Sequence, residues 1–408
     1  MSSSFQLRAR PNRLLRDHLL GVAENCERLT DDLLPICAQN PQLSAATLRK
    51  AAYVLGIAHD VGKATRYFQD WLPPKKARPK DLMLKSHSML SAVYAYFAAG
   101  RLFSESDHGQ VVPLYVSLAI QAHHGALNSP TIAATKSFGF RDTLAEQISA
   151  IERRNELDLI LKEAQLPTFS EFESQIKTQV QRRLRASVEL VRVPGEDLTR
   201  FFLLNMLFSV LIDADRMDAA GLPFRKRREV SSKTVEAYVH GLSEASRRGR
   251  NADENVAQGR DELFRMLSEK AALVPLHQHV FSVTAPTGFG KTLAGLNFAL
   301  KLRERLRKNG SPSRVVYVAP YLSILDQNFQ RIAEALEAAP GQTDILLLHH
   351  HLADMQYQIS ELPGETFSTL ESELLVEGWN AEVIVTSFIQ FFYAVIGSKA
   401  SQLRKLHN

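Results

Sequence analysis

The hydrophobic pattern of this 408-residue chain changes once, and this change most constrains its fold. Up to about residue 220, apolar residues recur at spacings of three and four, as in the segments 14–22, 89–97 and 201–211. This spacing is typical of amphipathic helices. From about Val280 onward, short β-branched runs alternate with helical segments, which indicates βαβ units and a parallel sheet. The chain is therefore predicted to be multidomain, with an all-α domain followed by an α/β domain.

A polar segment without periodicity separates the two patterns. It covers residues 243–259 and contains two glycines. We place the domain boundary there, which gives a helical domain over 1–245, a linker over 246–270 and an α/β domain over 271–408. The four runs expected to form strands of the second domain are 280–284, 314–318, 344–348 and 383–386.

Cysteine usage and hydropathy exclude several classes of protein. The only cysteines are Cys26 and Cys37, and they do not form a CxxC pair, so neither a thiolate zinc site nor a disulfide framework is expected. The longest apolar stretch, 201–212, is shorter than the ~20 residues that cross a bilayer, and the N-terminus shows no export signal. We therefore expect a protein of the reducing cytoplasm with no membrane partner.

The charge balance permits a polyanionic partner without requiring one. The 49 Lys and Arg residues exceed the 44 Asp and Glu residues by five. The positive charge is concentrated in five clusters, each of which can be a solvated face or a contact for a phosphate backbone: Arg8–Arg16, Lys75–Lys80, Arg182–Arg185, Arg225–Arg228 and Arg247–Arg250.

Histidines and aspartates lie beside apolar helical runs in the first domain. Packing of these helices would bring imidazoles and carboxylates into one bundle interior, as in helical di-metal proteins. Such donors without thiolate suit Fe, Mn, Ni or Co, and a carboxylate-rich position suits Mg. The candidate ligands are His18, His59, Asp60, His87, His123, His124 and one residue of the pair Asp213 and Asp215.

The order H…HD…H…HH…D of these residues resembles the HD phosphohydrolase superfamily. The HDxGK form at 59–63 and the adjacent histidines at 123–124 are similar to its nuclease branch. Asp215 matches the last ligand of that family better than Asp213, because Ala214–Asp215–Arg216 resembles its AD(W/R) element. The resemblance implies two metal sites that share one aspartate, the first made of His18, His59, Asp60 and Asp215, and the second of Asp60, His87, His123 and His124.

Two metal ions held in this way would supply the chemistry of phosphodiester hydrolysis. At about 3.5–4 Å from each other they would polarise the phosphodiester and lower the pKa of a bound water toward ~7. Asp60 is expected to bridge the two ions. Lys63, the last residue of the HDxGK segment, is expected to neutralise the charge that develops on the phosphorane. Asp60 and Lys63 are therefore the predicted catalytic residues.

A glycine-rich segment in the second domain predicts a phosphate-binding loop. Thr287, Gly288, Gly290, Lys291 and Thr292 follow an apolar run and precede a helical pattern. The glycines would let backbone amides turn toward phosphate oxygens, while the lysine would reach the β- and γ-phosphates and the threonine would bind Mg²⁺.

This loop resembles motif I of superfamily 2 helicases, in which alanine replaces the first glycine of a generic P-loop, as Ala285 does here. Segments 315–322 and 384–387 are similar to motifs Ia and Ic of the same superfamily. The D-E-x-H motif and the second RecA-like domain do not follow in these 408 residues. We therefore expect a truncated RecA-like domain that binds a nucleotide weakly without hydrolysing it, and use of ATP with Mg only in a full-length protein.

An HD domain followed by a superfamily 2 motor resembles the CRISPR-associated helicase-nucleases of type I interference systems. The resemblance implies metal-dependent endonucleolytic and exonucleolytic cleavage of single-stranded DNA, coupled in the full-length protein to ATP-dependent unwinding of invader DNA. It also implies recruitment by an RNA-guided surveillance complex. Two alternatives stay open: an HD phosphohydrolase of small nucleotides with a regulatory nucleotide-binding module, and a non-enzymatic binding module with a structural HD cluster. A closed pocket would favour the small-nucleotide enzyme, and an open basic groove the nuclease.

Overall fold

The computed structural model describes residues 5–31, 33, 44–73, 84–103, 111–128, 141–176, 198–221, 229–248, 254–311, 313–339, 342–350 and 376–407. The chain divides into two units. The first unit comprises Met1–Phe224 together with Ala394–His407, and the second comprises Arg225–Tyr393 with Asn408. No helix among the described residues has the length and apolar character needed to cross a membrane.

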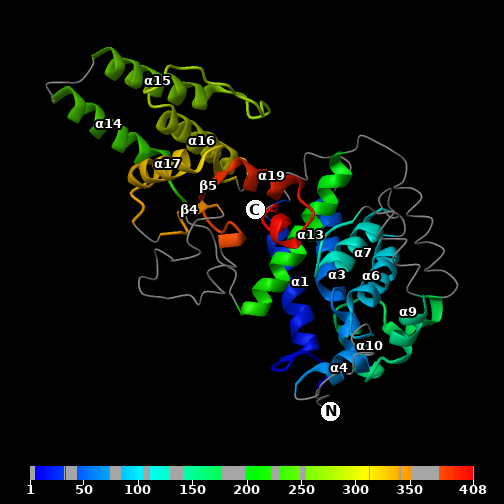
Figure 1. Ribbon diagram of the computed structural model, residues 1–408. Helices are drawn as coiled ribbons and strands as arrows, with labels where there is room; N and C mark the ends of the chain where they lie inside the picture. Colours follow the sequence, from blue (N-terminus) through cyan, green and yellow to red (C-terminus); the bar gives the residue numbers. More distant parts are fainter. Residues whose placement is uncertain are drawn as a thin grey trace. The chain divides into compact units, whose positions relative to one another are not determined.

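The first unit is a bundle of helices, as the sequence predicts (Figure 1). Its largest helices are α1 (Leu15–Asp31), α3 (Ala45–Ala58), α6 (Ser88–Leu102), α7 (Val112–Ala122) and α13 (Leu198–Ala220). Smaller helices surround them: η1 (Val61–Ala64), α4 (Arg66–Trp71), α9 (Arg141–Ser149), α10 (Arg154–Glu163), α11 (Phe169–Gln175) and α20 (Ala400–Leu403).

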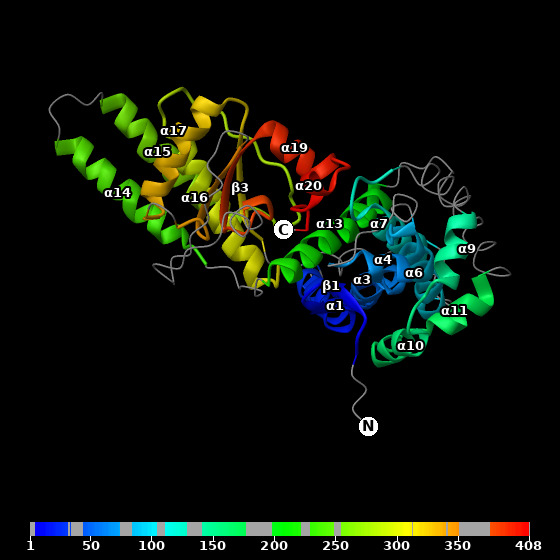
Figure 2. The ribbon, with the colours of Figure 1, turned by 60° about the horizontal axis from the view of Figure 1, so that its bottom comes forward.

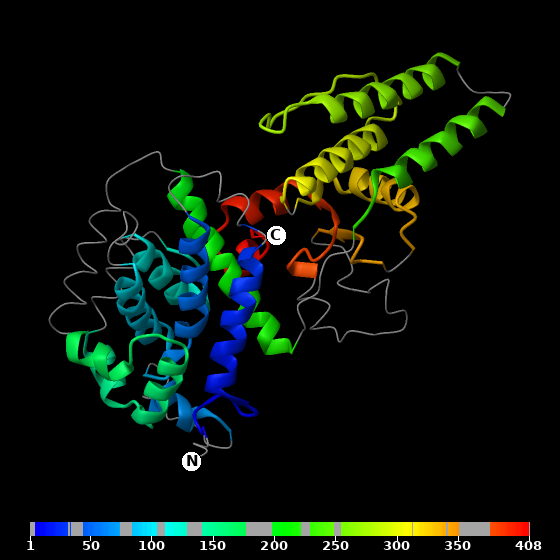
Figure 3. The same ribbon diagram turned by 180° about the vertical axis from the view of Figure 1, so that it is seen from behind.

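Amphipathic spacing explains how the bundle packs. Leu15, Leu19, Val22 and Cys26 form one buried face of α1, which packs against α3 and α13. Figure 3 shows α1 beside α13 from behind. A Cβ atom at Gly56 would lie 2.4 Å from the Cα atom of Ala23, so glycine at this position permits the close approach of α3 to α1.

Two features of the first unit were not expected from the sequence. A short antiparallel hairpin of β1 (Arg8–Arg10) and β2 (Arg13–Leu14) precedes α1. Residues 394–407, assigned above to the α/β domain, belong to the first unit, and α20 packs against α13. The local sequence does not indicate that residues 394–407 pack on the first unit, because this packing depends on partners almost 200 residues away in the sequence.

The second unit is built on a parallel three-stranded sheet in the order β3-β5-β4. The strands are β3 (Val315–Ala319), β4 (Leu346–His349) and β5 (Val383–Ser387), which confirms three of the predicted strands. Val383 of the central strand is paired with Val315 on one side and with Leu346 on the other. The helices of this unit are α14 (Ser232–Arg248), α15 (Glu254–Leu273), α16 (Lys291–Lys308), α17 (Leu322–Ala335) and α19 (Phe388–Ile396), the last of which continues into the first unit.

Two predicted segments differ in the structure. The run 280–284 forms no strand, and Val280 and Val283 are exposed. Most of the predicted linker over 246–270 forms the helix α15. This helix packs against α16 and buries Leu263 and Leu267, which stabilises the helical conformation (Figure 2). The change between the two units accordingly lies near residue 224 rather than near 245.

Candidate metal centre

Five helices of the first unit bring the predicted ligands together. His18 lies in α1, and Asp215 in α13. His59 and Asp60 directly follow α3, and His123 and His124 directly follow α7. His87 is the N-terminal cap residue of α6, and a Cβ atom at Gly62 would lie 2.5 Å from its carbonyl oxygen. Glycine in the HDxGK segment therefore lets the start of α6 approach the HD dyad.

The ligand atoms form two groups that share Asp60. One group consists of His18, His59, Asp60 and Asp215, and the other of Asp60, His87, His123 and His124; within each group these atoms lie within 4.8 Å of one another. These are the two quartets that the family resemblance implies. His124 is exposed and Asp215 is half-buried, whereas the other members are buried.

Each carboxylate oxygen of Asp60 faces a different group. Asp60 Oδ2 lies 2.9 Å from Nε2 of His18 and 3.2 Å from Nε2 of His59. Asp60 Oδ1 lies 2.8 Å from Nε2 of His87 and 3.5 Å from Nε2 of His123. One carboxylate is thus placed to bridge two cations.

Hydrogen bonds behind the imidazoles direct their Nε2 atoms into the centre. His59 Nδ1 donates to the carbonyl oxygen of Gly56 over 2.7 Å, and His123 Nδ1 donates to that of Ile120 over 2.5 Å. Among the described residues, buried Asp60 Oδ1 and His123 Nε2 have no partner with hydrogen-bond geometry, although Oδ1 lies within ion-pair distance of His87 and His123. Backbone-anchored imidazoles and unsatisfied buried acceptors are what a metal site requires, so the residues present fit divalent cations.

Burial and neighbouring charges shift the pKa values of the predicted ligands in different directions. Burial opposes the charge on Asp60, but His59 and Lys63 hold the pKa of this carboxyl well below its usual range. Burial would lower the pKa of His59, but Asp60 and Asp215 together raise it to about 10. Desolvation, with His123 and His87 nearby, lowers the pKa of His124 to about 3, so this imidazole is neutral at pH 7.

The two aspartates of α13 have different surroundings. Asp215 Oδ1 lies 3.6 Å from Nε2 of His18 and 3.8 Å from Nε2 of His59. Asp213 instead accepts a hydrogen bond of 2.6 Å from Nε of Arg404, and it also contacts His407. Burial opposes its charge, but the Arg404 guanidinium holds the pKa of Asp213 at about 2. The geometry therefore favours Asp215 over Asp213 as a metal ligand.

Lys63, the second predicted catalytic residue, lies beside the centre in η1. Its Nζ atom is 2.5 Å from Asp60 Oδ2 and lies over the ring of Phe68. Only 7% of the residue is exposed, so its charge is held close to Asp60.

Sequence reasoning missed the contacts of Asp218 and Arg10 with the predicted metal ligands. Asp218 accepts a hydrogen bond of 2.7 Å from Nδ1 of His18, and Nη2 of Arg10 lies 3.6 Å from Asp215 Oδ1. The position of Asp218, three residues after Asp215 on a helix, was an available signal, because such residues share a face. Arg10 belongs to the basic cluster Arg8–Arg16, and nothing in the sequence distinguishes it from the other arginines of that cluster.

The glycine-rich loop of the second unit has part of the expected geometry. Gly288 and Gly290 adopt φ angles of 86° and 74°, and Gly290 caps α16, which begins at Lys291. Lys291 Nζ donates to the carbonyl oxygens of Ala285 and Pro286 over 2.8 and 3.2 Å. Thr287 is exposed, and the Thr292 hydroxyl lies 3.2 Å from Oδ1 of Asn328. The loop and helix agree with the prediction, whereas the preceding strand is missing from the described residues.

Fold and site together define the class: an HD-type helical domain joined to an α/β domain with a phosphate-binding loop. Residues 7–195 match the family described as the Cas3 HD domain, and residues 265–387 match the DEAD/DEAH box helicase family. The chain is thus similar to a Cas3 HD domain over its first part and to a helicase domain over its second, which confirms its resemblance to the CRISPR-associated helicase-nucleases.

Individual relatives agree with this assignment. The chain is 26% identical over 425 residues to the CRISPR-associated nuclease/helicase Cas3 of Haloferax volcanii, a match that covers 93% of this chain and 44% of the relative. Crystal structures of T. fusca Cas3 with ATP and with AMPPNP share its fold, with TM-scores of 0.56 and 0.57 at 18% sequence identity. Both matches cover 99% of this chain, and they cover 45% and 46% of the two T. fusca chains, respectively. The chain therefore spans less than half the length of these relatives.

Proposed function

We propose that the first unit is a metal-dependent nuclease that hydrolyses phosphodiester bonds with two divalent cations. The observation that carries this proposal is the position of Asp60, whose two oxygens each face a separate group of imidazoles. His18, His59, Asp60 and Asp215 would hold one cation, and Asp60, His87, His123 and His124 the other. Bound cations would polarise the phosphodiester and supply a hydroxide near neutral pH.

The remaining residues of the centre position these ligands and supply positive charge. Asp218 orients the ring of His18, and the carbonyl oxygens of Gly56 and Ile120 orient His59 and His123. The Lys63 ammonium lies beside the predicted ligand Asp60, and the Arg10 guanidinium lies beside the predicted ligand Asp215. Their placement supports a role in binding phosphate oxygens and stabilising the charge of the transition state.

We propose single-stranded DNA as the substrate, with ATP-dependent unwinding by a full-length protein and an RNA-guided CRISPR surveillance complex as the recruiting partner. The name of the Haloferax volcanii relative supports the nuclease and helicase activities, and the T. fusca crystal structure with ATP supports nucleotide binding. We also propose that the substrate is invader DNA and that the native metal is Mn, Ni, Co, Fe or Mg. The proposed location is the cytoplasm, where the buried free thiol of Cys26 would be stable.

The basic clusters contribute little to this argument. Those at 75–80, 182–185 and 225–228, and the side chains of the cluster at 247–250, lie outside the described residues. In the remaining cluster, Arg13 pairs with Asp218, Arg16 pairs with Asp17 and Glu163, and Arg10 contacts Asp215. Arg13 and Arg16 are thus held in ion pairs, whereas Arg10 lies beside the predicted ligand Asp215, where it is placed to contact a phosphate.

The experiment that tests the proposal uses circular single-stranded DNA, which has no ends. We expect the purified chain to convert it to linear and then shorter products with Mn²⁺, Ni²⁺ or Mg²⁺, and to leave it intact with EDTA. Parallel reactions contain deoxynucleoside mono- and triphosphates. Release of phosphate from these compounds while the circle stays intact would contradict the proposal and support the small-nucleotide phosphohydrolase.

A further inference from the structure

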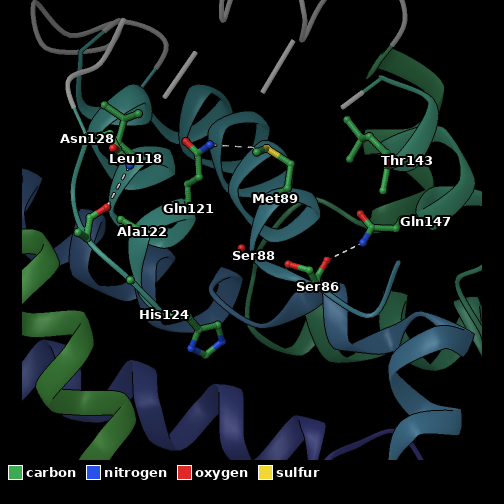
Figure 4. A pocket seen from close by; sticks show the side chains of 13 residues that line it. Ser86, Ser88, Met89, Leu118, Gln121, Ala122, His124, Asn128, Thr143 and Gln147 are labelled. Atoms are coloured by element: carbon green, nitrogen blue, oxygen red, sulfur yellow. Dashed lines mark hydrogen bonds between the residues drawn. The ribbon is translucent and has the colours of Figure 1, made fainter. Parts of the chain in front are cut away.

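A cavity of about 400 Å³ lies in the first unit beside the exposed imidazole of His124. The start of α6, the end of α7 and α9 contribute to its walls. Figure 4 shows Met89 and Thr143 on either side of the cavity, with His124 below them. Its volume falls within the range of pockets that bind small organic groups.

The chemistry of the described lining suits an uncharged group. None of the described residues that line the cavity is Asp, Glu, Lys or Arg, so none of these side chains would form an ion pair with a phosphate. Met89 and Leu118 supply apolar surface, while Ser88, Gln121, Asn128 and Thr143 supply donors and acceptors. Apolar surface combined with amide and hydroxyl groups suits a flat heterocycle that has polar edges, such as a nucleobase.

The cavity adjoins one of the two ligand groups. His124 lines it, and Nε2 of the same residue lies 2.9 Å from Nε2 of His87. Gln147 fixes the adjoining wall, because its Nε2 atom donates to the carbonyl oxygens of Leu84 and Ser86, just before His87. A group in the cavity would therefore be next to a phosphate on the metal centre.

We propose that this cavity binds the base of the nucleotide adjacent to the scissile phosphate. The inference rests on the proposed function, and it adds a nucleobase subsite to the metal centre. Because the hydroxyl and amide groups of the lining can both donate and accept hydrogen bonds, the subsite would accept all four bases. It would help to position the strand, while the metal centre would act on the phosphate.

The test compares two small diesters that release the same 4-nitrophenolate. Thymidine 5′-(4-nitrophenyl phosphate) carries a nucleoside, and methyl 4-nitrophenyl phosphate does not. The variant Thr143→Phe places a phenyl group in the cavity without altering a predicted ligand. Ala145→Phe, on the exposed side of the same helix, is the matched control.

We expect Thr143→Phe to lower kcat/KM for the thymidine ester by about tenfold, the scale of one lost base contact. Hydrolysis of the methyl ester and the metal content should stay unchanged, and Ala145→Phe should affect neither ester. An equal effect of Thr143→Phe on both esters, or an effect on neither, would overturn the subsite. If the unsubstituted protein cleaves neither ester, the proposed function fails and the subsite with it.

A second measurement needs no variant and is independent of whether Thr143→Phe folds. A single abasic position is moved along a single-stranded oligonucleotide, and the cleavage products are resolved at single-nucleotide length. We expect cleavage to weaken at one fixed offset from the abasic position. Cleavage that is indifferent to the abasic position would overturn the subsite, although it would leave the nuclease intact.

Discussion

Arg404 and Asp213 form a buried ion pair in the first unit, with 2.6 Å between Nε and Oδ1. The pair joins the segment 394–407 to α13. Asp213 lies in this helix two residues before the predicted ligand Asp215. The same segment contacts the loop that follows His124, because Leu127 N donates to Ser398 O over 2.8 Å and Ala400 N donates to Gly125 O over 3.1 Å. One segment thus supports two of the elements that carry ligands.

Replacement of Arg404 by alanine should destabilise the first unit strongly. It would leave the Asp213 carboxylate buried without its guanidinium partner, and loss of one member of a buried pair costs about 3–5 kcal/mol of unfolding free energy. Chemical denaturation of this variant measures the loss. The double variant Arg404→Met, Asp213→Leu removes both charges and should be more stable than Arg404→Ala. Equal stability of the two variants would show that the ion pair is not the cause.

Asp218→Asn should weaken metal binding without removing a ligand. The substitution replaces the carboxylate that accepts from His18 Nδ1, and loss of such a partner typically costs 10–100-fold in metal affinity. Titration with Mn²⁺ measures the affinity. Asp17→Asn, at a half-buried position of α1 next to His18, is the control and should retain the original value. Similar affinities for both variants would contradict a positioning role of Asp218.

Metal binding at pH 7 should release protons. His59 is protonated in the metal-free protein, because the nearby carboxylates raise its pKa to about 10, and it must be neutral to bind a cation. We expect about one proton per protein molecule to be released when a cation binds to the ligand group that contains His59. Calorimetric titration in buffers of different ionisation enthalpy measures the number. A binding enthalpy that does not depend on the buffer would refute the assignment of His59.

The sequence predicts the helical bundle and the grouping of the candidate ligands well because these depend on local signals. Apolar spacing marks α1, α6 and α13, and the ligands stand at or beside the ends of such runs. Asp213 and Asp215 could be separated from the sequence only by resemblance, since their difference lies in a contact with Arg404 almost 200 residues away. The run 280–284 has the composition of a strand but no partner among the described residues, and a strand forms only where another completes its hydrogen bonds.

Lys291→Ala should leave ATP-free cleavage of single-stranded DNA unchanged. Lys291 lies in the second unit and is exposed, where its Nζ atom donates to two carbonyl oxygens of its own loop. All predicted metal ligands lie in the first unit. Timed cleavage of a labelled oligonucleotide without nucleotide checks this expectation. A large loss of cleavage, with normal folding by circular dichroism, would show that the two sites are not separable.

The most direct test of the shared carboxylate is the cleavage of circular single-stranded DNA by Asp60→Asn in Mn²⁺. The substitution keeps the size of the side chain but removes the charge that faces both groups of imidazoles. We predict that cleavage falls to the level of the original protein in EDTA, with the fold retained. Cleavage by Asp60→Asn at the original rate would contradict a metal centre that is bridged by Asp60.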